Sequence, residues 1–135
     1  MKKILLSSVL CLICVCFASG ALAAEVQPYS STLIISCNVF ISSSGTTIYA
    51  DASILTNVTS DTLGFSYIRI QELRGSSWVT VKSVTEQYKA NGITYSYRLS
   101  YAGTAGKVYR ATTGFYAEDA GLSDSRSRTS ESCSI

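Results

Sequence analysis

Strict alternation of apolar and polar side chains is the feature that most limits what this chain can fold into. It is cleanest over residues 93–101, where one set is Ile93, Tyr95, Tyr97, Leu99 and Tyr101 and the other is Thr94, Ser96, Arg98 and Ser100. A period of two puts each set on its own side of a strand. Beyond the first 23 residues, no stretch of a dozen keeps the 3.6-residue period of an amphipathic helix. The sequence therefore predicts an all-β protein.

The first 23 residues have the layout of a secretory signal peptide. Lys2 and Lys3 precede an apolar run over residues 4–17, and Ala21-Leu22-Ala23 supplies the small residues of a cleavage site. The run of about 14 residues is shorter than the roughly 20 that cross a bilayer as a helix. We therefore expect cleavage after Ala23, a single secreted, extracellular domain over residues 24–135, and no stable membrane insertion after cleavage.

Removing this segment changes the charge balance. Two of the 11 basic residues leave with it, so the remaining basic residues equal the 9 acidic ones in number, and the chain has 0 His. A neutral domain lacks the basic footprint of a nucleic-acid binder. Without His there is no histidine general base and no histidine metal ligand. We expect no nucleic-acid partner, no catalytic residues, no metal site and no cofactor.

Two of the five cysteines remain in the mature chain. Cys37 falls in a predicted strand and Cys133 near the C-terminus. An exporting pathway permits disulfides, and an even number of cysteines favours one. The sequence therefore predicts a Cys37–Cys133 disulfide, with two separate thiols as the alternative.

Runs of alternating and β-branched residues predict about seven short strands. Six are expected over residues 33–41, 48–54, 63–73, 78–84, 93–101 and 107–117. Residues 120–135 are expected to form either a polar edge strand or a frayed tail. Residues 57–61, which contain the glycosylation sequon at Asn57, are predicted as a polar connection, and Asn91-Gly92 as a tight turn. The pattern predicts a single antiparallel β-sandwich.

The segment Gly106-Lys107-Val108-Tyr109-Arg110-Ala111 resembles the start of the sixth strand in immunoglobulin-like and fibronectin type III domains. In those domains a tyrosine returns its hydroxyl to the backbone, and a core residue follows two positions later. The resemblance implies that Tyr109 forms a structural tyrosine corner and that Ala111 lies in the core. This sequence has no cysteine at Ala111, so the inter-sheet disulfide of true immunoglobulin domains is missing.

The mature chain is also similar to a largely uncharacterised group of small secreted proteins of Gram-positive bacteria. Members combine Leu-x-x-Gly-x-x-Trp with a later Gly-x-x-Tyr-Arg. This sequence has Leu73-Arg74-Gly75-Ser76-Ser77-Trp78, one register from a strict match, and the Gly106–Arg110 segment. The resemblance implies an immunoglobulin or fibronectin type III-like fold and no particular activity, because such sandwiches host unrelated functions.

Tyrosine is the informative excess, with 9 in the chain. Tyr95, Tyr97 and Tyr101 share a face with apolar neighbours and are expected to line the core. Tyrosine and tryptophan also combine a flat apolar surface with a polar tip, which suits glycan stacking and protein interfaces. Tyr49, Tyr67 and Tyr88 fall on the less apolar faces, and with Trp78 they make up the candidate ligand or partner surface. A Trp at this place in a sandwich is more often a core anchor than a ligand platform, so we expect a core position for Trp78 and keep a surface position as the alternative.

We therefore expect a secreted, non-enzymatic domain with a binding or structural role toward an unidentified protein or glycan. One alternative is a small carbohydrate-binding module that uses the same aromatics. Another is a hydrolase with paired carboxylates, such as Glu72 and Glu118. The acidic turn near residues 118–124 lacks the ligand spacing of calcium loops and is expected to be a solvated turn.

Overall fold

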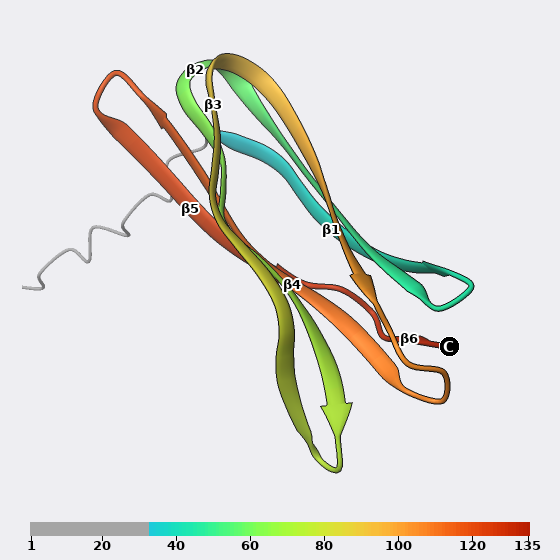
Figure 1. Cartoon of the computed structure of the whole chain (residues 1–135). Coiled ribbons are helices and arrows are strands. Elements are labelled where there is room, and N and C mark those ends of the chain that lie inside the picture. Colours follow the sequence, from blue (N-terminus) through green and yellow to red (C-terminus); the bar gives the residue numbers. More distant parts are fainter. Residues whose placement is uncertain (1–32) are drawn as a thin grey trace, which may run out of the picture.

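The structure, a computed structural model, describes residues 33–135 (Figure 1). The predicted signal peptide, its cleavage site and residues 24–32 lie outside the described residues. Residues 33–135 form one curled antiparallel sheet with no helix, so the prediction of an all-β chain is confirmed. No helix long and apolar enough to cross a membrane occurs in this range. The strands are β1 (Ile34–Ser44), β2 (Thr47–Arg74), β3 (Ser77–Ala102), β4 (Val108–Asp119), β5 (Leu122–Thr129) and β6 (Cys133–Ser134).

Two very long strands, β2 and β3, organise the sheet. They pair with each other along almost their whole length. β1 pairs with β2 as far as Thr56, and β4 pairs with β2 from Thr62 onward. β5 and the short β6 extend the sheet from β4. Figure 1 shows the β2–β3 ribbon bending back on itself, so that it forms two arms.

The bend lies where the sequence predicted a connection and a turn. Instead, β2 continues through residues 57–61 and β3 through Asn91-Gly92, with a register shift between Leu55 and Ser60. Asn91 has the positive φ, 51°, that makes Asn-Gly a turn former, but here it bends a strand whose residues before and after the bend both pair with β2. The two predicted connections are therefore bends, and four predicted strands merge into two.

Side-chain to backbone contacts satisfy the polar groups of the bend. The buried Thr56 hydroxyl lies 2.8 Å from the carbonyl oxygen of Val58 and 3.1 Å from that of Ile93. The buried Ser60 hydroxyl also reaches the Val58 carbonyl, at 3.3 Å. Such local bonds replace the ladder bonds that are missing where the register shifts.

The inner faces of the two arms pack against each other. Phe65 and Tyr95, which are not ladder partners, stack with ring centroids 5.5 Å apart, and Tyr101 contacts Tyr109 at 6.1 Å. Tyr95, Tyr97 and Tyr101 are partly buried against the core, as their alternation predicts. The core consists of Leu33, Ile34, Cys37, Val39, Ile48, Ala50, Ala52, Ile54, Leu63, Phe65, Ile68, Ile70, Leu99, Tyr109, Ala111, Phe115 and Ala117.

The C-terminal residues form the polar edge strand rather than a frayed tail. β5 pairs with β4 over its full length. The buried carboxylate of Asp124 on β5 accepts a hydrogen bond of 3.0 Å from the backbone N–H of Ile34, at the start of β1, and has Arg126 at 3.4 Å. This bond ties the first residue of β1 to β5, with which β1 is not paired in the sheet.

Candidate binding face

Tyr88 and Tyr116 meet on the outer face of the sheet, across Gly64. The register places Gly64 of β2 opposite both tyrosines, and their rings meet edge to face with centroids 5.8 Å apart. Gly64 has φ +153°, and a Cβ there would overlap the carbonyl oxygen of Gln87. The Tyr116 hydroxyl donates a 2.6 Å hydrogen bond to Glu118, which raises the pKa of Tyr116 above 10.0.

Tyr67 and Arg69 form a second unit on the same face. Gly114 of β4 lies opposite Tyr67, and a Cβ there would come within 2.6 Å of the Tyr67 ring. The ring therefore occupies the space that a side chain at position 114 would need. The guanidinium of Arg69 lies 4.2 Å from the centre of the Tyr67 ring, within cation–π range. Beside this unit is a shallow hollow of about 340 Å³ lined by Ser66, Tyr67, Gly114, Phe115, Ser125, Arg126 and Ser127.

Trp78 and Arg110 form a third unit at the end of this face nearest the β2–β3 turn. The Arg110 guanidinium lies 4.3 Å from the centre of the Trp78 ring. Its Nε donates a 2.8 Å hydrogen bond to the side-chain oxygen of Gln71, and the Gln71 amide donates to the Thr80 hydroxyl at 3.5 Å. Trp78 is half-buried on the outer face and is not among the residues that pack against the core, so the core-anchor position expected for it is wrong.

These units form one continuous strip. The β2 positions that carry or oppose them run from Gly64 to Leu73, a length of about 30 Å at the rise of an extended strand. We call the six side chains the aromatic–arginine face: Tyr67, Arg69, Trp78, Tyr88, Arg110 and Tyr116. Among them, Tyr88 is the most open of the tyrosines, with 41% of its surface exposed.

Arg69 and Arg110 differ from three other arginines in their ionic partners. Arg74, Arg98 and Arg126 each lie within 4.0 Å of a carboxylate. Within residues 33–135, no carboxylate comes that close to Arg69 or Arg110. The aromatic–arginine face therefore presents two guanidinium groups whose charge is not compensated by an ion pair.

Tyr49 lies apart from the other three predicted surface residues. It is on the outer face of the opposite arm, where Arg98 lies 4.9 Å from its ring centre and forms two hydrogen bonds with Asp51, of 2.6 and 3.0 Å. A separate hollow of about 390 Å³ there includes the exposed Phe40. The predicted set is thus divided, because strand alternation shows which side a residue faces but not which arm carries it.

Three members of the face were missed by the surface prediction: Arg69, Arg110 and Tyr116. Arg110 and Tyr116 alternate with the core residues of β4, so the alternation over residues 108–119 predicts that both face away from the core. The glycines at 64 and 114 were a further signal, because glycine within a strand often marks a close approach of neighbouring groups. The pairing of Tyr88 with Tyr116 depends on strand order, which the sequence does not supply.

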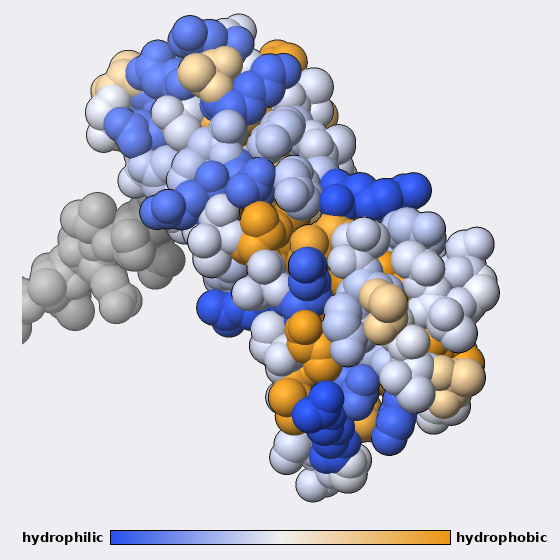
Figure 2. All heavy atoms as spheres, viewed as in Figure 1, coloured by the Kyte–Doolittle hydropathy of each residue, from blue (hydrophilic) through white to orange (hydrophobic). Residues whose placement is uncertain are grey.

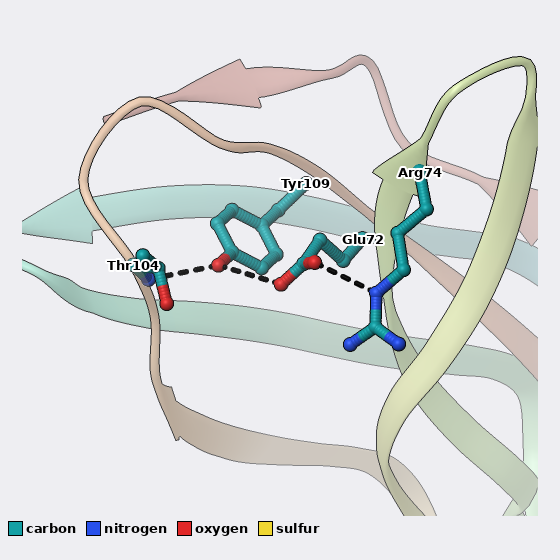
Figure 3. Close-up of polar contacts among 4 residues, drawn as sticks. All are labelled: Glu72, Arg74, Thr104 and Tyr109. Atoms are coloured by element: carbon teal, nitrogen blue, oxygen red, sulfur yellow. Dashed lines mark hydrogen bonds and ion pairs between the residues drawn. The ribbon is translucent and has the colours of Figure 1, made fainter.

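A polar network surrounds the buried Tyr109, at the end of the β2–β4 ladder farthest from the bend (Figure 3). The Tyr109 hydroxyl accepts a 2.8 Å hydrogen bond from the backbone N–H of Thr104 and donates a 3.0 Å bond to Glu72 Oε2. Glu72 Oε1 accepts a 2.9 Å hydrogen bond from Arg74 Nε. The bond from Arg74 is the main cause that lowers the pKa of Glu72 below 4.5, and burial is the main cause that raises the pKa of Tyr109 above 10.0. The backbone contact implied for Tyr109 is present.

The predicted Cys37–Cys133 disulfide is not formed. Cys37 is buried in β1, and the Cys133 sulfur lies 3.6 Å from the hydroxyl of Ser43, near the far end of the same strand. Residues 37 and 43 are about 20 Å apart along an extended strand, whereas bridged cysteines have Cα atoms within roughly 7 Å. The register of β6 on β4 therefore keeps the two thiols apart.

The carboxylates do not form an obvious catalytic or metal site. Glu72 lies opposite Tyr109 and Glu118 opposite Thr62, at the two ends of the β2–β4 ladder. The separation is about 30 Å by strand rise, several times the distance between the carboxyl groups of glycosidases. This pair therefore cannot act on one bond. Residues 33–135 contain no group of three His, Cys, Asp or Glu side chains that could hold a metal ion.

Comparison with known proteins adds no functional assignment. No protein-family model and no curated protein matches the chain. Among solved structures, the sporulation control protein Spo0M from Bacillus subtilis is similar, with 7% sequence identity and a TM-score of 0.41. The match covers 70% of this chain and 48% of that chain, so this chain spans about half of its length. A likeness of this size carries no statement about activity or partners.

Proposed function

We propose that this protein is a secreted, non-enzymatic binding domain of immunoglobulin or fibronectin type III-like sandwich type, and that its contact surface is the aromatic–arginine face. Three of the four surface residues expected from the sequence, Tyr67, Trp78 and Tyr88, lie on this one face. That observation carries the proposal. Tyr, Trp and Arg are the residue types that contribute most to binding at interfaces.

The face is also preorganised. Each of its rings is held by a neighbour: Tyr88 by Tyr116, Tyr67 by Arg69 and Trp78 by Arg110. Side chains that are already fixed lose little conformational entropy when a partner binds. A strip on three paired strands is also flatter and more rigid than one built on loops.

A carbohydrate-binding module is the more specific form of this proposal. The observation that favours it is the hollow beside Tyr67, which is rimmed by the hydroxyl groups of Ser66, Ser125 and Ser127. Hydroxyl groups next to an aromatic ring suit a sugar, whose polar edges form hydrogen bonds while its apolar side covers the ring. Serine is depleted in protein–protein interfaces.

Alanine variants of the outer-face aromatics test the location of the contact surface. A glycan array and immobilised polysaccharides first identify a ligand that the purified protein retains. Trp78→Ala and Tyr88→Ala should each then weaken that binding about tenfold or more. Tyr49→Ala is the matched control, because it removes an arginine-stacked tyrosine from the opposite arm, and it should leave binding unchanged. Equal losses in all three variants, or none, would contradict the proposed surface.

Secretion is tested separately. Expression of the full chain in a bacterium that exports proteins should place it in the medium with a new N-terminus at Ala24, as read by mass spectrometry. Retention of residues 1–23 on a protein that stays with the cells would contradict a secreted role.

A further inference from the structure

The two unpaired arginines of the aromatic–arginine face lie side by side. Arg69 pairs with Thr112 in the β2–β4 ladder, and Gln71 pairs with Arg110, so the arginines are diagonal neighbours on adjacent strands. Such neighbours have Cα atoms about 7–8 Å apart, within reach of long side chains. Both side chains extend from the outer face, because each stacks on a ring of that face.

The rings and Gln71 fix the guanidinium groups without neutralising them. Arg110 uses its Nε on Gln71, which leaves its terminal nitrogens for another acceptor, and Arg69 has no carboxylate within 4.0 Å among the described residues. A guanidinium has five N–H donors, and stacking leaves the edge that carries them accessible. Planar groups held in this way suit bidentate hydrogen bonds to a carboxylate or sulfate.

The attraction for an anion is local rather than global. Apart from the two lysines before the apolar N-terminal run, basic and acidic residues are equal in number, so the chain after the predicted cleavage site has no excess charge to attract polyanions. The acidic groups Glu86 and Glu118 lie at the other end of the face. There burial, followed by the charge of Glu86, raises the pKa of Tyr88, and the hydrogen bond to Glu118 raises the pKa of Tyr116. The Arg69–Arg110 end is therefore the positive end of the strip.

We infer that the Arg69–Arg110 pair binds the carboxylate or sulfate groups of an anionic polysaccharide; this inference rests on the proposed function. A polysaccharide fits better than an acidic protein, because the surroundings of the pair are rich in hydroxyl groups and poor in exposed aliphatic side chains. Thr112 lies opposite Arg69, and Ser125 and Ser127 rim the neighbouring hollow. Figure 2 shows one side of the molecule, on which hydrophobic residues gather in several patches near the middle, among polar residues. The large exposed aliphatic residues lie elsewhere: Ile35, Leu55, Val58, Ile93 and Leu122.

The test compares polymers that differ in charge. Binding of the purified protein is measured on immobilised dextran sulfate, on polygalacturonate, on neutral dextran and on poly-L-glutamate. Retention by dextran sulfate or polygalacturonate, with no retention by dextran and weaker retention by poly-L-glutamate, is the expected result. Comparing the binding to dextran sulfate with the binding to polygalacturonate shows whether the site prefers sulfate or carboxylate. Binding should weaken as ionic strength rises, because salt screens exposed charges.

Charge-matched variants locate the site. Arg69→Gln and Arg110→Gln should each weaken binding on the order of tenfold, because each removes charge-assisted hydrogen bonds. Arg128→Gln is the control: it removes the same charge from the exposed Arg128, which lies opposite the core residue Thr113 rather than on the aromatic–arginine face. Arg69→Gln alters an exposed side chain, so its thermal unfolding midpoint should stay unchanged even if that of Arg110→Gln falls.

Each other outcome contradicts a defined part of the inference. If Arg128→Gln weakened binding as much as Arg69→Gln and Arg110→Gln do, only net charge would matter, and the proposed location of the site would be wrong. If poly-L-glutamate bound as tightly as the anionic polysaccharides, or more tightly, the inference that the ligand is a polysaccharide would be wrong. Binding to neutral dextran that Trp78→Ala abolishes and Arg69→Gln does not affect would overturn the anionic ligand while supporting the proposed function. Failure of all four polymers to bind would overturn the inference, and the glycan array would still decide the proposed function.

Discussion

Tyr109 and Glu72 share a buried 3.0 Å hydrogen bond in which the phenol O–H donates to the carboxylate, while the phenol oxygen accepts from Thr104. Tyr109→Phe would leave the buried Glu72 carboxylate and the backbone N–H of Thr104 without this hydroxyl. The free energy of unfolding should fall by about 1–3 kcal/mol. Urea unfolding measures the change. Tyr101→Phe is the control, since Tyr101 contacts the same ring, and a loss equal to that of Tyr109→Phe would contradict the role of the bond.

The lowered pKa of Glu72 predicts a loss of stability in acid. A carboxyl whose pKa is lower in the folded state stabilises that state above its unfolded value, 4.5, and this contribution disappears as the pH falls through the lower folded pKa. Arg74 is the first cause, so the Glu72–Arg74 bond is what protonation weakens. Glu72→Gln should flatten the fall in unfolding free energy between pH 5 and pH 3, whereas Glu131→Gln, at an exposed position, should not. Parallel pH profiles for wild type and Glu72→Gln would contradict this prediction.

The hydroxyl of Thr113 is buried in the core and has no hydrogen-bond partner among the described residues. Burial of an unpaired hydroxyl costs about 1–3 kcal/mol. Thr113→Val keeps the shape of the side chain and removes that cost, so thermal and urea unfolding should both show a gain of about 1 kcal/mol. Thr112→Val, on the outer face, should change stability by less. A destabilised Thr113→Val protein would mean that the hydroxyl has a partner.

Gly64 should tolerate substitution far less than Gly75. Both have positive φ, but a Cβ at Gly75 meets nothing within 4 Å, whereas one at Gly64 overlaps backbone atoms of β3. Gly75→Ala should therefore lower the free energy of unfolding only by the backbone strain of a positive φ, about 1–2 kcal/mol. Gly64→Ala adds a steric overlap and should cost about 3 kcal/mol or more. Equal costs in urea unfolding would show that β3 moves away freely at this point.

The separation of Cys37 and Cys133 predicts two free thiols. Thiol titration of the denatured, unreduced protein should therefore count both cysteines. Cys133→Ser should leave the unfolding midpoint nearly unchanged, because a serine hydroxyl can keep the contacts of the Cys133 sulfur with Ser43 and with the carbonyl of Ser134. Absence of titratable thiols in a monomer would show that the C-terminus reaches Cys37 by another path.

The sequence predicted correctly those strands and turns that residue type and spacing determine locally. The alternation over residues 93–101 correctly indicated a strand and the inward position of Tyr95, Tyr97 and Tyr101. The interval left between the expected strands 63–73 and 78–84 is also a turn, in which Gly75, with positive φ, joins β2 to β3. These features follow from residue type and spacing alone.

Features that depend on pairing between strands far apart in the chain could not be predicted from the sequence. Asn91-Gly92 has turn chemistry, but β2 pairs with β3 on both sides of it, so the tertiary pairing converts a turn into a bend. The same limit explains why Tyr49 was grouped with Tyr67. Both face outward, and only the fold of the β2–β3 ribbon shows that they belong to different arms.

The edge position of β3 has a further consequence, for the behaviour of the protein at high concentration. Among residues 33–135, β3 pairs only with β2, so within this range no strand covers the other side of its 26 residues, which can pair with another chain. Long flat edges of this kind are templates for aggregation. Here the edge is interrupted by positive φ angles at Glu86 and Asn91 and carries the exposed lysines Lys82 and Lys89. The same irregularities that bend the ribbon therefore also protect it from joining its copies edge to edge.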